Sequence, residues 1–383
     1  METVISTKTD ISKPRYELLD GLRGVAALMV IWYHFGEGFA TSAIDQWTNH
    51  GYLAVDFFFV LSGFVLGYAY NDRWKQGLTP WRFMLRRVIR LQPMVVMGVT
   101  LGAIAYLIQG SVHWDGTPVA FHWVAVSLVM GLLLLPVWPG FGGEVRGNGE
   151  MFPLNGPSWS LFFEYIGSFL YGIWLHRLSR KALTAVVIIS GIGLGACVAG
   201  NLSGSYHQGI GWSIADYGFL GGFMRLSFSF SAGLLMSRTF RPRRIRGAFW
   251  ICSALIVAAL SCPYIGSTDG MTPSVWNGVY DIACTWALFP AIVYIGACGT
   301  TTDHFSSSAC EALGRLSYPI YIIHYPLMYL FYAWVWGNGV SVREAMPVCA
   351  GIFAAILLLA WVATRFYDEP VRRWLSDRLL QKR

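Results

Sequence analysis

The chain has 383 residues, of which 55% are hydrophobic, 16% aromatic and only 13% charged, and its formal net charge is +7. Soluble domains carry about 25% charged residues, so this composition disfavours a water-soluble enzyme, a disordered chain and a fibrous repeat. It indicates a membrane protein that crosses the bilayer several times.

A helix of about 20 apolar residues crosses the hydrocarbon core of a bilayer. We expect helices because the apolar segments are far longer than the strands of a membrane barrel. Residues 1–17 are polar and lack the apolar core of a signal peptide, so the first span directs its own insertion. The candidate spans are 19–39, 51–70, 87–109, 122–138, 157–175, 182–200, 218–237, 247–264, 282–298, 314–336 and 346–364.

Basic residues predict the direction of the spans, because positively charged connections stay on the cytoplasmic side. Only Arg146, Arg225 and Arg343 lie outside the segments assigned to that side. The topology therefore accounts for the net charge without a nucleic-acid partner. The other basic residues fall in the N-terminal segment, the mouth of the first span, residues 71–90, 176–181 and 238–246, the stretch that ends at Arg315, and the tail from Arg365.

Strict alternation across eleven spans would place the basic segment 176–181 outside. The conflict disappears if 122–138 does not cross, and this segment is short and leads into the Gly/Pro-rich stretch 139–157. We therefore predict an all-α, polytopic bundle with about ten crossings and one re-entrant or interfacial helix. Residues 1–18 and 367–383 are predicted cytoplasmic tails that flank a membrane domain at 19–366.

The first span carries two ionisable residues, Arg23 and His34, and such side chains within a membrane indicate a functional site. Eleven residues at 100° each return to within about 20° of the same face, about 16 Å further along the helix. Arg23 is predicted at the cytoplasmic mouth and His34 toward the outer half of the membrane. One helical face thus joins a cationic mouth to a titratable base.

The third span begins with a run of basic residues that includes Arg86, Arg87 and Arg90. Arg87 and Arg90 are three positions apart, so they are neighbours on one helical face. One interpretation is a plain cytoplasmic flank. The other is a binding site for an anionic cofactor, because paired guanidinium groups suit phosphates.

Two carboxylates, Asp56 in the second span and Glu164 in the fifth, are predicted at a depth similar to that of His34. A carboxylate beside an imidazole fixes its tautomer and raises its basicity, which favours general-base catalysis. A buried salt bridge or a helix-packing hydrogen bond is the alternative. Arg225 is a possible partner of Glu164 or of an acceptor.

His324 is predicted mid-membrane in a span that also contains Pro319 and Pro326. The prolines free backbone carbonyl groups that are able to line a cavity, whereas the alternative for His324 is a hydrogen bond to a neighbouring helix. The seven cysteines show no paired spacing, so we expect neither a disulfide framework nor a metal site.

Six segments together resemble the acyltransferase-3 family of membrane acyltransferases over about residues 16–374. The resemblance includes the family's Arg/Lys-x10-His motif, which Arg23 and His34 match, and its RxxR motif, which Arg87 and Arg90 match. Asp368-Glu369-Pro370 departs slightly from the Glu-Arg-Pro that is frequent in the family. The segments are Leu19–His34, Val55–Phe64, Arg87–Arg90, Ser158–Glu164, Leu316–His324 and Tyr367–Pro370.

The resemblance implies transfer of an acyl group, usually acetyl from cytoplasmic acetyl-CoA, to a hydroxyl of a carbohydrate or glycan. Arg23, Arg86, Arg87 and Arg90 are then the expected CoA-binding residues, with no metal involved. His34 is the expected general base, Glu164 or Asp56 its orienting carboxylate, and His324 a further catalytic candidate. An acyl-histidine intermediate is equally compatible with these residues.

The main alternative is a proton-coupled transporter that uses His34, Glu164 and His324 as a proton relay. The halves of the sequence show no evident inverted repeat, which disfavours that alternative. We expect a multi-pass protein of the cell membrane, specifically a bacterial inner membrane, with both termini cytoplasmic.

Overall fold

The computed structural model describes residues 16–215, 217–301 and 303–380, and over these it is a helical bundle, as predicted. The expected cytoplasmic placement of residues 1–15 and 381–383 lies outside the described residues. The helices are α1 Glu17–Glu37, η1 Asn49–Leu53, α2 Ala54–Lys75, α3 Pro80–Ile108, α4 Phe121–Leu132, α5 Ser158–Ile173, η2 Leu175–Arg177, α6 Arg180–Ala199, α7 Gly218–Thr239, α8 Ala248–Ser261, α9 Val275–Ala283, the π-turn η3 Cys284–Leu288, α10 Phe289–Cys298, α11 His304–Asn338, α12 Val342–Ala363, the π-turn η4 Thr364–Asp368, and α13 Glu369–Leu380.

Local capping chemistry explains where several of these helices begin. The Thr79 side chain accepts a hydrogen bond from the Arg82 amide at the start of α3, and Ser179 does the same at the start of α6. Ser341 and Glu344 form a reciprocal capping box at the start of α12. Such side-chain oxygens satisfy amide groups that the first helical turn leaves unpaired.

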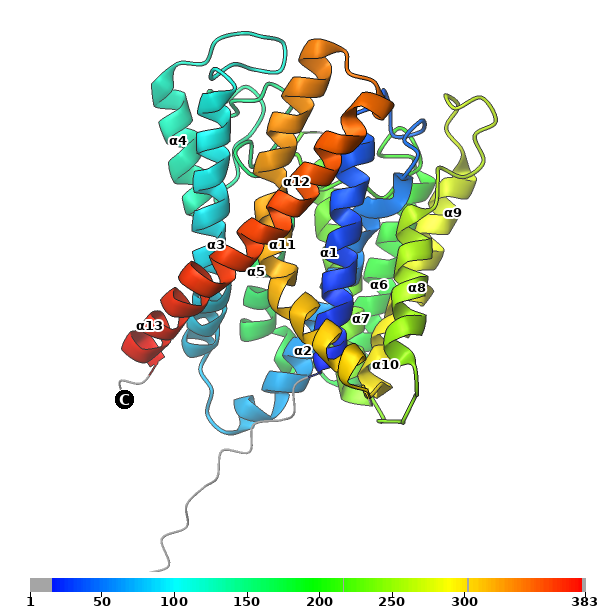
Figure 1. Cartoon of the computed structure of the whole chain (residues 1–383). Coiled ribbons are helices and arrows are strands. Elements are labelled where there is room, and N and C mark those ends of the chain that lie inside the picture. Colours follow the sequence, from blue (N-terminus) through cyan, green and yellow to red (C-terminus); the bar gives the residue numbers. More distant parts are fainter. Residues whose placement is uncertain (1–15, 216, 302, 381–383) are drawn as a thin grey trace, which may run out of the picture.

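The helices run between two ends of the bundle (Figure 1), and the basic connections gather at one of them. There Trp74 of α2 stacks on His176 with ring centres 4.1 Å apart, and Arg238 of α7 donates to the Leu178 carbonyl at 2.5 Å. The amide of Ile245 bonds the Cys298 carbonyl, which joins two further connections. We call this the basic end and the opposite one the far end.

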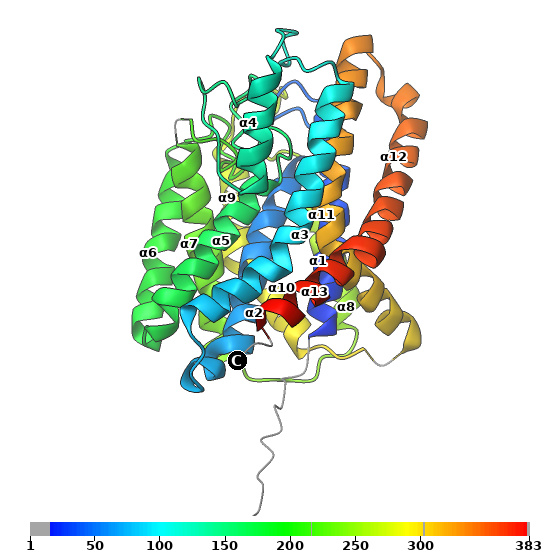
Figure 2. The same cartoon turned by 90° about the vertical axis from the view of Figure 1, so that its left-hand side faces the viewer.

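Helix α4 enters and leaves the bundle on the side of the far end (Figure 2). The Gln92 amide, midway along α3, donates to the Leu132 carbonyl at 2.6 Å where α4 ends. The chain then returns, because Tyr106, near the end of α3, donates to the Val145 carbonyl at 2.8 Å. This is the geometry of the re-entrant segment predicted at 122–138.

Within the described residues, seven helical segments are long and apolar enough to cross a membrane, so the chain is a multi-pass membrane protein. Helices α5 and α8 follow the expected spans but are shorter, with 16 and 14 residues. Helix α11 is long but contains many polar residues, and it packs along α1 in the centre of the bundle. Its middle part, residues 317–335, is mostly buried in the protein, whereas both ends are exposed.

Helices α2 and α7 touch through their backbones. A Cβ atom at Gly63 would lie 2.0 Å from the Phe230 carbonyl oxygen, and one at Gly233 would lie 2.0 Å from that of Val60. Small residues allow such close approach, which is how helices associate within a membrane. The pair therefore forms a tightly packed wall.

The segment predicted as a tail after residue 366 is helical as far as Leu380. Helix α12 passes through η4 into α13, which packs against α3 near the basic end (Figures 1 and 2). Asp368, the last residue of η4, is buried, and α13 after it lies on the surface of the bundle with no fully buried residue. The C-terminal segment thus belongs to the folded bundle.

Candidate active site

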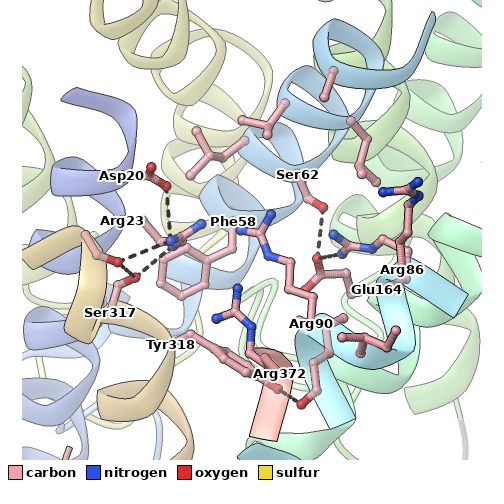
Figure 3. A pocket seen from close by; sticks show the side chains of 18 of the residues that line it. Asp20, Arg23, Phe58, Ser62, Arg86, Arg90, Glu164, Ser317, Tyr318 and Arg372 are labelled. Atoms are coloured by element: carbon pink, nitrogen blue, oxygen red, sulfur yellow. Dashed lines mark hydrogen bonds and ion pairs between the residues drawn. The ribbon is translucent and has the colours of Figure 1, made fainter. Parts of the chain in front are cut away.

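A cavity of about 1590 Å³ begins at the basic end of the bundle. Its walls come from α1, α2, α3, α5, α11 and the η4–α13 segment (Figure 3). Along α2 the lining residues run from Gln76 to Val55, which is about 30 Å at helical rise. Ordinary small-molecule sites have volumes of about 300–1,000 Å³, so this cavity has room for a long, extended ligand.

The cavity is positively charged. Among the described residues, eight arginines and six carboxylates line it, and the arginines include Arg23, Arg86, Arg87 and Arg90. Arg90 lies within electrostatic range of Arg23, Arg87 and Arg372, so side chains from α1, α3 and α13 share one part of the cavity (Figure 3). The structure therefore brings together all four arginines that the sequence analysis singled out.

Local contacts orient two of these arginines. The Nε atom of Arg23 donates to the Ser317 hydroxyl at 2.8 Å, and its Nη2 lies 3.1 Å from a carboxylate oxygen of Asp20. The Nε atom of Arg86 is buried and has no hydrogen-bond partner within the described part of the chain. Arg86 thus retains an unused donor at the cavity wall.

Glu164 lies in the cavity, where Arg87 forms an ion pair with it and Ser62 donates to it at 3.0 Å. Ser168 accepts a second bond from Arg87 at 3.2 Å. The Glu164 side chain is 22% exposed, so water reaches this pair. The predicted contact between Glu164 and His34 is wrong for this structure, because the carboxylate faces the arginine of α3.

Asp56 also has an arginine partner rather than His34. Its carboxylate accepts hydrogen bonds from Nε and Nη2 of Arg225, the shorter at 2.7 Å, and another from Gln208 at 3.1 Å. Both charged side chains are fully buried. The predicted contact between Asp56 and His34 is therefore wrong here too, because the Asp56 carboxylate is bonded to the buried guanidinium of Arg225. The possible pairing of Arg225 with Glu164 is not formed either.

The carboxylate that contacts His34 is Glu37, one helical turn further along α1. The Nδ1 atom of His34 lies 2.6 Å from a Glu37 oxygen, and Tyr332 donates to the same oxygen at 2.8 Å. Because a carboxylate accepts, Nδ1 carries the hydrogen and Nε2 is left as the basic nitrogen. A carboxylate placed in this way orients an imidazole for general-base chemistry.

His324 stacks on His34, with ring centres 5.3 Å apart and planes inclined by 28°. Its Nδ1 atom lies 3.2 Å from the Ile320 carbonyl oxygen, so Nδ1 carries the hydrogen. Its Nε2 atom is buried without a hydrogen-bond partner among the described residues. Both predicted histidines thus meet in one imidazole pair near the far end.

One aromatic layer separates this imidazole pair from the cavity. Tyr321 and Phe58 line the cavity with ring centres 5.5 Å apart, and Tyr321 lies 5.9 Å from His324. The Tyr321 hydroxyl is hydrogen-bonded to Ser160 at 2.7 Å. The cavity therefore approaches the histidines but ends at the Tyr321 ring.

Another acidic group lies beyond the histidines, in the connection between α4 and α5. Tyr329 donates to Glu150, and its ring packs on Tyr325, which packs on His34 at 4.8 Å. Burial raises the pKa of Glu150 to about 7, against hydrogen bonds from Tyr329 and Asn148 that lower it. A titratable carboxyl group is thus linked to the imidazole pair through two tyrosines.

The arrangement combines two chemical abilities: an arginine-rich cavity suits a phosphorylated anion, and the imidazole pair with its carboxylate suits proton abstraction from a hydroxyl. Sequence reasoning missed Glu37, Tyr321 and Arg372. The i, i+3 spacing of His34 and Glu37 was a readable signal. The position of Arg372 depends on how the C-terminal helix packs, which no local pattern encodes.

Comparisons with known proteins agree with this chemistry. The model of a family described as "Acyltransferase domain" matches residues 16–365. The chain is 27% identical to Acyltransferase MdmB of Streptomyces mycarofaciens over 388 aligned residues, which cover 95% of this chain and 93% of that protein. No solved structure matches.

Two other relatives also match the chain, one of them over about half of it. Protein 2 in picA locus of Rhizobium radiobacter is 38% identical over 186 residues, which are 46% of this chain and 92% of that protein. O-acetyltransferase OatA of Staphylococcus aureus is 23% identical over 94% of this chain. The chain spans 58% of the length of that enzyme.

Proposed function

The chain belongs to the acyltransferase-3 family of membrane proteins, and from this premise we propose that it transfers an acyl group, acetyl in the first instance, from acyl-CoA to a hydroxyl of a carbohydrate or glycan. The observation that carries the proposal is the cavity itself. It leads from a cluster of arginines at the basic end to within one aromatic ring of the imidazole pair.

In this proposal the arginines hold the phosphates of the donor. Arg23, Arg87 and Arg90 lie where a nucleotide would enter from the basic end, with Arg86 on the same wall. A guanidinium binds phosphate through two parallel hydrogen bonds, which gives direction as well as affinity. The length of the cavity along α2 suits the extended pantetheine arm of CoA.

His34 then acts as the general base, with Glu37 as its orienting carboxylate. The Nε2 atom of His34 takes the hydroxyl proton as the acceptor oxygen forms a bond to the thioester carbon. The carbon–sulfur bond breaks, the thiolate of CoA leaves, and the protonated imidazole returns its proton to that sulfur. The products are an O-acyl ester and CoA with a free thiol.

The thioester reaches His34 only if Tyr321 moves. Its ring stands between Phe58 and His324, and its hydroxyl bond to Ser160 holds it there. Rotation of a single side chain would connect the donor cavity to the histidines. This barrier also protects the thioester from premature contact with water from the far end.

The proposal places the protein in a cell membrane, specifically a bacterial inner membrane, with both termini in the cytoplasm. The basic connections at one end support that orientation, because positive charge is retained on the cytoplasmic side. Donor then enters from the cytoplasm, and acceptor approaches His34 from the far end. Neither a metal nor a nucleic acid takes part.

The test is an acyl-transfer assay with purified protein, labelled acetyl-CoA and a panel of sugars, followed by mass spectrometry of the product. His34→Ala should lower turnover by about 10²–10⁴, the usual contribution of a general base, and leave thermal unfolding unchanged. A His34→Ala variant that keeps most of its activity would remove His34 from this role. Trapping labelled enzyme without acceptor would instead indicate an acyl-histidine intermediate.

Glu37→Gln tests the orienting carboxylate separately. It keeps the hydrogen-bonding shape but removes the charge that favours the imidazolium, so kcat should fall at least tenfold with little change in the KM for the donor. Glu311→Gln is a matched control, because that carboxylate pairs with Arg315 near the basic end, away from His34. Equal kcat values for both variants would rule out the role of Glu37.

A proton-coupled transporter is the less favoured reading. Its relay would include Glu164 together with His34 and His324, but Glu164 is paired with Arg87 in the cavity. Transport would appear as flux driven by a pH gradient in proteoliposomes without CoA. The acyltransferase proposal predicts no such flux.

A further inference from the structure

The C-terminal helix contributes to the cavity, although the family segment noted in the sequence, Tyr367–Pro370, reaches only its first two residues. Residues Asp368, Glu369, Arg372, Arg373 and Leu380 all line the cavity wall. Arg372 lies within electrostatic range of Arg90, and Figure 3 shows its guanidinium directed into the cavity. The segment lines the cavity with carboxylates as well as arginines, and it is Arg372 that adds a guanidinium to the region of the predicted phosphate-binding arginines.

Contacts with the rest of the bundle hold α13 in this place. Glu369 accepts a hydrogen bond from Arg315 of α11 at 2.9 Å, and α13 packs on α3. Nη1 of Arg372 donates at 3.0 Å to Asp368, the last residue of η4. Asp368 is buried, so it gives the guanidinium a fixed anchor at the cavity wall.

The ion pair with Asp368 uses only one face of Arg372. A guanidinium has five N–H donors, and the bond to Asp368 involves Nη1 alone. The Arg372 side chain is 42% exposed, which leaves the other donors accessible from the cavity. An anchored guanidinium with spare donors is preorganised to bind an anion.

We propose that α13 forms one wall of the acyl-donor site and that Arg372 binds a phosphate of CoA, with Asp368 as the residue that positions it. The inference rests on the proposed function, since it takes CoA as the donor. It adds to the donor site an arginine outside the RxxR segment and a helix beyond the region matched by the family model.

The experiment measures CoA affinity by titration calorimetry on the full chain in detergent. Arg372→Gln should bind CoA about tenfold more weakly, as expected for one charge-assisted hydrogen-bonding partner. Arg378→Gln is the matched control: Arg378 lies on the same helix, stacks on Trp374 and does not line the cavity. Its affinity should stay within about twofold of the parent.

Two further variants separate binding from folding. Arg372→Lys keeps the charge but loses the fork, so its affinity should lie between those of the parent and Arg372→Gln. Asp368→Asn should weaken binding by a smaller factor, because Arg372 remains but is less firmly placed. Equal affinities for Arg372→Gln, Arg372→Lys and Arg378→Gln would overturn the proposal.

Repeating the titrations with dephospho-CoA identifies the phosphate. If the effect of Arg372→Gln disappears, Arg372 binds the ribose phosphate; if it persists, it binds the pyrophosphate, and both results support the proposal. If the parent binds CoA, and Arg87→Gln weakens that binding but Arg372→Gln does not, only the inference about Arg372 is wrong. A parent protein that binds no CoA would sink the proposed donor as well.

Discussion

Two arginine–carboxylate pairs in the bundle share the same chemistry but lie in very different surroundings. Arg87 and Glu164 meet at the wall of the cavity, where Glu164 is 22% exposed. Arg225 and Asp56 meet where both side chains are fully buried, and Arg225 also donates to the carbonyl groups of Tyr52 and Ile210. The difference separates a pair that a ligand can reach from one that it cannot.

Burial decides what each pair can do. A pair of which one member is reached by water exchanges partners more easily, because solvent and salt weaken its attraction, and in the cavity that member is Glu164 whereas Arg87 is 4% exposed. A fully buried pair cannot lose one member without leaving a charge in a medium that solvates it poorly. We therefore assign Arg225 and Asp56 to holding α2 and α7 together, and Arg87 and Glu164 to the donor site.

The largest effect is expected when one member of the buried pair is removed. Asp56→Ala should destabilise the protein by about 3–5 kcal/mol, because it leaves Arg225 buried and uncompensated. Glu164→Ala, the same kind of change at the cavity, should cost less than Asp56→Ala, because Glu164 is 22% exposed and water in the cavity reaches the place that it leaves. Thermal unfolding in detergent measures both, and equal losses would break the comparison.

Asp56→Asn sharpens the same comparison. It keeps the shape of the side chain and some of its hydrogen bonds, so its loss of stability should be smaller than that of Asp56→Ala. Turnover per folded molecule should match the parent, because Asp56 does not contact His34. If Asp56→Asn unfolds at the same temperature as the parent but loses turnover, Asp56 takes part in catalysis as first predicted.

A smaller, kinetic effect is expected from Glu164→Gln. The change removes the charge that competes with a phosphate for Arg87, so the KM for acyl-CoA should fall a few-fold while kcat changes little. Steady-state kinetics at varied donor concentration provides the measurement. A fall in kcat at unchanged KM would instead favour direct involvement of Glu164 in the chemistry.

The smallest effect concerns Glu150, a buried acid at the far end rather than in the cavity. Burial raises its pKa from 4.5 to about 7 in the folded protein, so its protonated form stabilises the fold. That contribution is complete below about pH 4.5 and is lost as the pH rises through about 7. The melting temperature should therefore fall between pH 5 and pH 8 more in the parent than in Glu150→Gln.

Glu164→Gln is the control for this pH series, because that carboxylate lies in the cavity rather than in the buried far-end cluster. It should retain the parent's pH dependence. If Glu150→Gln retains it as well, the dependence arises from another group.

The fold was largely predictable because long apolar segments and the distribution of arginine and lysine are strong signals in a membrane protein. Strict alternation of the spans would have put the basic segment 176–181 outside, and this conflict correctly indicated that α4 and the connection after it turn back instead of crossing. The unpredicted parts were α13 and the π-turn before it. They depend on contacts with α3 and α11, and a polar, amphipathic end of a chain gives no sign of where it packs.

The sequence predicted which helices carry the residues of the site, but not which side chains pair with one another. Arg87 and Arg90 are neighbours because the RxxR spacing fixes them on one face of α3, and Arg23 joins them because α1 and α3 line the same cavity. The partners of Glu164 and Asp56 were mistaken because similar depth in the membrane does not determine which helices are neighbours. Rotation of each helix about its axis decides that, and the packing of α2 against α7 directs Asp56 toward Arg225.

The glycine contact between α2 and α7 has a mechanical consequence. With Gly63 and Gly233 pressing one backbone on the other, that side of the bundle behaves as a rigid plate. If the product is CoA, as proposed, it should depart through the side that can yield, where the partly exposed ion pair between Arg315 and Glu369 attaches α13 to α11. A cross-link between α13 and α3 should slow release while leaving the bond-making step untouched.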